Sequence, residues 1–152
     1  GEFIAFLDSD DLWLPEKLEI QIEFMKKNNY AFTHTSYYFI NEVGKKLPKI
    51  YRSKAKLSYK DMLYSNRIGC LSVVLNQGKI GKLYMPEMRK RQDYAHWLTI
   101  LKKESFAFGI EQPLAIYRLR NSSVSSNKVE MLKWNFQLFY KNQINFQTKY
   151  HL

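Results

Sequence analysis

The sequence has little cysteine, proline or glycine, and it has no long run of apolar residues. Its single cysteine, Cys70, cannot form an internal disulfide and has no metal-ligand companion nearby, so we expect a small buried side chain in a reducing compartment. No apolar run approaches the roughly 20 residues of a membrane-spanning helix, and the first residues lack the order of a signal peptide. These absences favour a soluble, cytoplasmic protein.

The six glycines and four prolines are too scattered to mark a linker, and the chain has no internal repeat. With 152 residues, of which 45% are hydrophobic and 16% aromatic, there is ample material for one packed core. We therefore expect residues 1–152 to form a single unit rather than two domains.

Acidic residues are also scarce, since 14 Asp and Glu face 24 Lys and Arg, for a formal charge of +10. Residues 45–67, here called the basic segment, hold eight basic residues against one acid, with tyrosines between them. Such a segment suits an anionic partner, which could be a nucleotide diphosphate, a lipid headgroup or a nucleic acid. The alternative is a solvated basic loop without a dedicated partner.

Apolar periodicity predicts an alternation of strands and helices. The expected strands cover residues 3–7, which should be fully buried, 31–40, 70–75 and 106–117, the last broken by Pro113. The first expected helix begins at Pro15 and ends at residues 26–29. Further helices are expected over residues 58–65, 89–104 and about 127–143. The last helix has two apolar stripes, and the second stripe needs another surface, which could be a missing part of the domain, a second subunit or a membrane.

Three carboxylates follow the first expected strand, at Asp8, Asp10 and Asp11. Carboxylates at positions i and i+2 of a loop can converge on one hard cation, with water and phosphate oxygens as its remaining ligands. Mg²⁺ or Mn²⁺ is the ion expected to bind such a loop. Aspartate clusters also form turns and helix caps, so the triplet alone leaves both interpretations open.

Three segments resemble motifs of the family 2 inverting glycosyltransferases, in the family's order. The stretch GEFIAFLDSDDLWLPEKLEIQ resembles the segment with the DxD motif, and RQDYAHWL resembles the later (E/R)xDxxxW helix. The stretch AIYRLRNSSVSSNK resembles the following segment with a Tyr-Arg pair and a serine-rich loop, while residues 41–90 match only in layout. The resemblance implies an α/β GT-A fold, which is a Rossmann-like mixed sheet with flanking helices.

The resemblance also implies roles for individual residues. Asp8 would contact the sugar nucleotide, and Asp10 would bind the divalent metal, Mn²⁺ or Mg²⁺, that bridges the diphosphate. Asp93 would be the general base that deprotonates the acceptor, and Trp97, one turn further along the same helix face, would form a wall of the acceptor pocket. Arg118 would add positive charge near the diphosphate, unless it is an ordinary surface arginine.

The sequence departs from the family pattern at two places. Arg120 stands where many relatives have a histidine, which leaves a third metal ligand from this loop in question. The nucleotide-binding strands with which the family's fold begins are also missing, so we expect part of a catalytic domain that begins at the DxD strand. A central parallel strand without its neighbours would expose an edge and favour self-association.

The function implied is metal-dependent, inverting transfer of a sugar from a nucleotide-diphospho-sugar, expected to be a UDP-sugar. Whether this fragment is active by itself is left open by the sequence. The acceptor would be a glycan or a lipid-linked molecule of cell-surface polysaccharide synthesis, reached by peripheral association with the inner face of the membrane. One alternative is a non-catalytic remnant that binds glycan or anionic lipid. Nucleic-acid binding through the basic segment is not expected, because no recognised nucleic-acid motif accompanies the charge.

Overall fold

The computed structural model describes residues 1–88 and 90–120, and the last expected helix lies outside this part of the chain. The described strands are β1 (Phe3–Ala5), β2 (Leu12–Trp13), β3 (Phe32–Ile40), β4 (Lys46–Tyr51), β5 (Lys56–Ser58), β6 (Val74–Asn76) and β7 (Phe106–Arg118). The described helices are α1 (Lys17–Asn28), α2 (Tyr59–Tyr64), α3 (Gln77–Ile80) and α4 (Gln92–Glu104), with a 3₁₀ turn, η1 (Cys70–Ser72).

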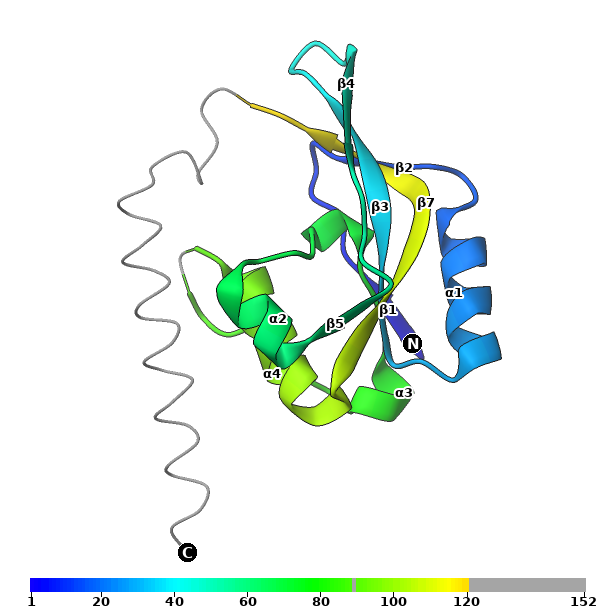
Figure 1. Cartoon of the computed structure of the whole chain (residues 1–152), viewed down its shortest axis with the longest axis vertical. Helices are drawn as coiled ribbons and strands as arrows, with labels where there is room; N and C mark the ends of the chain where they lie inside the picture. Colours follow the sequence, from blue (N-terminus) through cyan, green and yellow to red (C-terminus); the bar gives the residue numbers. More distant parts are fainter. Residues whose placement is uncertain (89, 121–152) are drawn as a thin grey trace, which may run out of the picture.

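The strands form one mixed sheet in the order β1-β6-β3-β7-β2, with β4 added to β3 and β5 added to β7. Strands β3 and β7 run parallel through its centre, from the pair Thr33 and Phe108 to the pair Ile40 and Arg118. Helix α1 lies on one side of the sheet, and α2 and α4 lie on the other (Figure 1). The α/β mixed sheet with flanking helices that the sequence predicted is thus confirmed.

Strand β7 continues past Pro113, where the sequence predicted a break. Its register against β3 shifts at this point, because Thr35 pairs with Ile110 while the next residue, Ser36, pairs with Pro113. Two residues of β7 are therefore extra and lie exposed, so the missing N–H of proline does not interrupt the ladder. The bulge lets β7 run on to Arg118, which brings its end beside the loop after β1.

Two expectations for the first strand are wrong. Its described part is half-buried rather than fully buried, and it pairs antiparallel with β6, through Ile4 and Leu75, rather than in parallel. In the part of the chain that the structure describes, β6 is its one strand partner. Within residues 1–88 and 90–120 no strand lies beside its opposite edge, and the apolar side chains of β1 keep part of their exposure.

The expected strand over residues 70–75 is also shorter than predicted. Residues 70–72 form η1, in which both the backbone N–H and the hydroxyl of Ser72 donate to the carbonyl of Gly69, at 3.0 and 2.7 Å. A serine that bonds its own local backbone offers an alternative to the strand ladder, and only β6 remains extended.

Helix α1 buries a different face from the one that its apolar residues predict. Met25 is buried as expected, but Leu18 is 39% exposed, while Lys17 and Gln21 are fully buried. Burial of polar side chains is tolerable when they bond one another. Lys17 Nζ donates to Gln21 Oε1 at 2.8 Å, and Gln21 Nε2 donates to Thr33 Oγ1 at 3.1 Å, which ties the helix to β3.

Helices α2 and α4 agree with the sequence, whereas the short α3 was not predicted. Helix α2 starts with the expected capping box, in which Ser58 and Asp61 bond each other's backbone N–H. Helix α4 buries its apolar stripe, including Tyr94, Leu98 and Leu101, in the main core with β3, β5 and α2. The basic segment is not a loop, because it contains all of β4 together with β5 and α2.

Candidate functional site

The acidic loop, residues 7–11, connects β1 to β2 and begins where the apolar strand ends. A backbone bond from Asp11 N to Asp8 O, 3.1 Å long, closes it into a turn. Asp8 is exposed, the Asp10 side chain is 28% exposed, and Asp11 is buried with 5% exposure. The loop therefore offers Asp8 and Asp10 to the solvent and sends Asp11 into the protein.

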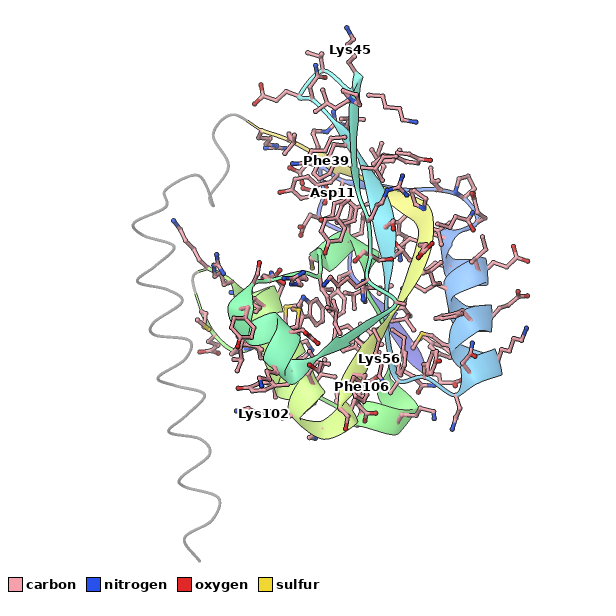
Figure 2. All side chains as sticks on the ribbon, viewed as in Figure 1. Asp11, Phe39, Lys45, Lys56, Lys102 and Phe106 are labelled. Carbon is pink, nitrogen blue, oxygen red and sulfur yellow. The ribbon has the colours of Figure 1, made fainter. Side chains whose placement is uncertain are left out.

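Asp11 anchors the acidic loop to the end of β7. Its Oδ1 accepts the backbone N–H of Arg118 at 2.9 Å. Burial raises the pKa of Asp11 to about 6, with smaller contributions in the same direction from the charges of Asp10 and Asp8, against the opposing Arg118 N–H. Figure 2 places Asp11 on the part of the sheet near the β3–β4 hairpin. The residue is thus a structural anchor, which the sequence pattern left undefined.

The side chain of Arg118 holds carbonyl oxygens of two loops. Its Nε donates to Asp10 O at 2.9 Å, and its Nη1 donates to Glu42 O at 3.1 Å and Asn41 O at 3.3 Å. These bonds join the acidic loop to the turn after β3, which the sequence correctly placed at residues 41–44. These bonds give Arg118 a structural role in holding the two loops together. The expected contact between Arg118 and a diphosphate stays a prediction.

Arg120 pairs with the expected metal ligand. Its Nε lies 2.8 Å from Asp10 Oδ2, and the two side chains are 54% and 28% exposed. The sequence noted Arg120 only as a departure from the family pattern. Its position two residues after Arg118 could have indicated the contact. In an extended chain, side chains two residues apart point to the same side, so both arginines can reach the acidic loop.

Asp93 lies in the first turn of α4, after Arg91 in a left-handed conformation with φ of 60°. Burial raises the pKa of Asp93, and the negative charge of Asp8 raises it further, against the opposing N–H of Tyr94 and charge of Arg91. The structure therefore brings the expected base into the electrostatic range of the acidic loop. These two groups are 85 positions apart in the sequence.

Trp97 is a core residue in this structure, with no exposed surface. Its ring contacts Phe6, at 5.3 Å between ring centroids, and Phe32, at 5.4 Å. Its Nε1 has no hydrogen-bond partner in residues 1–88 and 90–120. The expected role in an acceptor wall stays a prediction, while the observed contact with Phe6 fixes α4 against the strand that enters the acidic loop.

The phenol of Tyr117 is under the electrostatic influence of the acidic site. Burial raises the pKa of its phenol, and so do the charges of Asp11, Asp10, Asp8 and Asp93, in that order. The negative charges of all four carboxylates thus act on this one half-buried phenol. The sequence quoted Tyr117 only as half of a Tyr-Arg pair and gave it no role.

The thiol of Cys70 is influenced by three of the same carboxylates and is a poor nucleophile. Burial raises the pKa of Cys70 to about 12, and the charges of Asp8, Asp93 and Asp11 act in the same direction. The thiol therefore stays protonated at neutral pH, which argues against a nucleophilic cysteine. Cys70 is half-buried and packs beside the main core, close to the small buried role that was expected.

The carboxylates suit a cation only if a substrate completes its coordination. No group of three or more His, Cys, Asp or Glu side chains in the described part of the chain could hold a metal ion by itself. Mg²⁺ and related hard cations are commonly held by one or two carboxylates together with substrate phosphates and water. The partly exposed Asp10 carboxylate, with exposed Asp8 on the same loop, fits this incomplete kind of site.

The buried carboxylate yields a stability prediction. The pKa of Asp11 in the folded protein, about 6, lies above the ordinary value of 3.8. The stability of the fold that depends on protonated Asp11 is therefore fully present below pH 3.8 and is lost as the pH rises through 6. Asp11→Asn keeps the acceptor oxygen but carries no charge. We expect it to raise the free energy of unfolding at pH 7.5 by up to about 3 kcal/mol and to have little effect at pH 4. Urea unfolding at both values checks this, and an equal effect at both would contradict it.

Two curated proteins resemble most of the chain. A Bacillus subtilis protein named as the teichuronic acid biosynthesis glycosyltransferase TuaG is 44% identical over 133 residues, which cover 88% of this chain and 53% of that protein. The Escherichia coli UDP-Glc:alpha-D-GlcNAc-diphosphoundecaprenol beta-1,3-glucosyltransferase WfgD is 42% identical over 137 residues, covering 88% of this chain and 52% of that protein. The chain thus spans about half the length of the curated relatives it matches.

A solved structure supports the fold. S. aureus TarS 1-349 in complex with UDP-GlcNAc superposes with a TM-score of 0.58 at 16% identity, over 84% of this chain and 38% of that one. Residues 1–95 match the model of Glycosyl transferase family 2. The matched residues include the acidic loop and Asp93. Together with the two close relatives, this match shows that the chain belongs to glycosyl transferase family 2.

Proposed function

We propose that the protein contributes the metal-binding and acceptor-activating side of an inverting sugar transferase. The donor is a nucleotide-diphospho-sugar, and the acceptor is a glycan or a lipid-linked molecule. The observation that carries the proposal is the packing of α4 on the strand before the acidic loop, through Trp97 and Phe6, together with the influence of the Asp8 charge on Asp93. The two segments hold complementary groups for one displacement. The names of the relatives support the donor and acceptor classes, since WfgD is named for UDP-Glc and a diphosphoundecaprenol acceptor.

The reaction needs a proton acceptor at α4 and a group that neutralises the leaving diphosphate at the acidic loop. The acceptor hydroxyl oxygen forms a bond to the anomeric carbon, and the bond from that carbon to the diphosphate oxygen breaks. Asp93 accepts the hydroxyl proton, and the departing nucleoside diphosphate keeps the electron pair. Attack from the face opposite the leaving group inverts the anomeric centre. The raised pKa of Asp93 strengthens it as a base, because a carboxylate of higher pKa binds a proton more readily.

The acidic loop serves the leaving group. Asp10 would hold Mn²⁺ or Mg²⁺, with Asp8 against the sugar nucleotide, and the cation would neutralise charge that develops on the diphosphate. Asp11 and Arg118 keep the loop in place through their bonds across to β7. Trp97 sets the distance between α4 and the loop by its contact with Phe6.

Two substitutions separate the proposed roles. Asp93→Asn removes the base, so we expect kcat to fall by about 10² to 10⁴ while Mn²⁺-dependent UDP binding persists. Asp10→Asn should abolish that binding, and Glu19→Gln, on the exposed side of α1, should change neither property. The measurements are sugar transfer from UDP-glucose to a lipid-diphosphate acceptor and calorimetric titration with UDP and Mn²⁺.

A kcat for Asp93→Asn within threefold of the wild type would contradict the assignment of the base. Binding of UDP that is unaffected by Mn²⁺ and by Asp10→Asn would contradict the metal role. A wild-type protein that binds glycan or anionic lipid but neither UDP nor Mn²⁺ would favour the non-catalytic binding module instead.

We also propose peripheral membrane association through the β3–β4 hairpin. Its tip holds Val43, which is 86% exposed, followed by exposed Lys45 and Lys46 (Figure 2 labels Lys45). Lysines beside an anionic membrane surface contribute about 1 kcal/mol each to binding. Among residues 1–88 and 90–120, no helix has the length and apolar character needed to cross a membrane.

The double substitution Lys45→Ala/Lys46→Ala should therefore weaken sedimentation with vesicles that contain 30% phosphatidylserine. The charge-matched change Lys26→Ala/Lys27→Ala, at the end of α1, should leave sedimentation unchanged. Equal binding of the wild-type protein to anionic and neutral vesicles would contradict the proposal.

Self-association is proposed from the open edge of β1. Unpaired N–H and C=O groups along a strand edge are a template for pairing with another chain, and β1 has β6 as its one strand partner in the described residues. We expect a dimer or a larger species in light scattering at micromolar concentration. A single monomeric species across that range would contradict this expectation.

A further inference from the structure

The two arginines at the end of β7 are bonded in different ways. The guanidinium of Arg118 is occupied by backbone carbonyls of the acidic loop and of the turn after β3. The guanidinium of Arg120 instead lies on a side-chain carboxylate, with Nε 2.8 Å from Asp10 Oδ2. Arg118 therefore stabilises the loop backbone, whereas Arg120 neutralises the charge that the loop presents.

The contact of Arg120 with Asp10 is built to be exchangeable. The arginine side chain is 54% exposed, and the carboxylate is 28% exposed, so neither needs to leave a packed core. An ion pair with this exposure contributes little free energy, because water and salt screen it. A divalent cation that binds Asp10 must compete with the guanidinium for the same carboxylate.

We propose that Arg120 is an internal competitor of the divalent cation for Asp10, so that the cation binds well only together with a nucleoside diphosphate. This inference rests on the proposed function, since it concerns the metal site of that reaction. When the cation takes the carboxylate, two positive groups come close together, and their repulsion opposes binding of the cation alone. A diphosphate supplies the negative charge that compensates both groups.

The exchange gives the site an order of events. In the free protein, the guanidinium of Arg120 is paired with the Asp10 carboxylate. Arrival of the diphosphate with its cation releases Arg120 from Asp10. Arg120 thus acts on metal binding only through Asp10, the carboxylate with which it is paired.

Titration with Mn²⁺, followed by the electron paramagnetic resonance signal of the free ion, tests the inference without sugar transfer. Removal of the competitor in Arg120→Ala should tighten binding of Mn²⁺ alone by about fivefold, the size expected for a half-exposed ion pair. Arg52→Ala removes the same charge from an exposed position directly after β4 and should match the wild type. Added UDP should strengthen Mn²⁺ binding more in the wild type than in Arg120→Ala.

The outcomes separate the inference from the proposed function. Equal, measurable Mn²⁺ affinity in the wild type and Arg120→Ala would overturn the competition while leaving the metal role of Asp10 intact. Equal tightening in Arg120→Ala and Arg52→Ala would also overturn it, because the effect would then be one of total charge. Absence of Mn²⁺ binding in all three proteins, with and without UDP, would overturn the inference and the metal part of the proposed function together.

Discussion

The site depends on one hydrogen bond, from the backbone N–H of Arg118 to the buried carboxylate of Asp11. It joins residues that are 107 positions apart and fixes the acidic loop to the end of a central strand. The buried charge costs stability, as the raised pKa of Asp11 indicates, but the turn that it anchors leaves Asp10 and Asp8 facing outward. A neutral anchor would be more stable, and it would lack the charge that this bond uses to hold the loop.

A second constraint sets the base opposite the loop. Helix α4 packs through Trp97 on Phe6, the last residue before the loop, and on Phe32 of β3. Asp93 stands one helical turn before Trp97, so packing of the ring also positions the carboxylate. The result is a half-buried region where four carboxylates raise the pKa of Tyr117. Mutual repulsion of these carboxylates is unfavourable without a compensating cation, and Arg120 supplies one positive charge in the free protein.

The sequence predicted the features that depend on local chemistry. The capping box of Ser58 and Asp61, the turn at residues 41–44 and the buried stripe of α4 all follow from spacing and residue type, and the structure confirms them. Features that depend on partners distant in the chain were missed. Burial of Lys17 needs a chain of hydrogen bonds from Lys17 to Gln21 and from Gln21 to Thr33. Continuity of β7 through Pro113 needs a bulge against β3. The motif resemblance supplied the candidate site residues, but only the structure distinguishes Asp11 as an anchor from Asp10 as an exposed carboxylate.

The most direct test of the account is a crystal structure with UDP and Mn²⁺, measured at a wavelength where manganese scatters anomalously. The account predicts one anomalous peak in bonding contact with the Asp10 carboxylate and the diphosphate, with Asp93 across the donor and the Arg120 guanidinium displaced from Asp10. A manganese peak away from the acidic loop, or a bound diphosphate with Asp10 still paired to Arg120 and no metal between them, would contradict it.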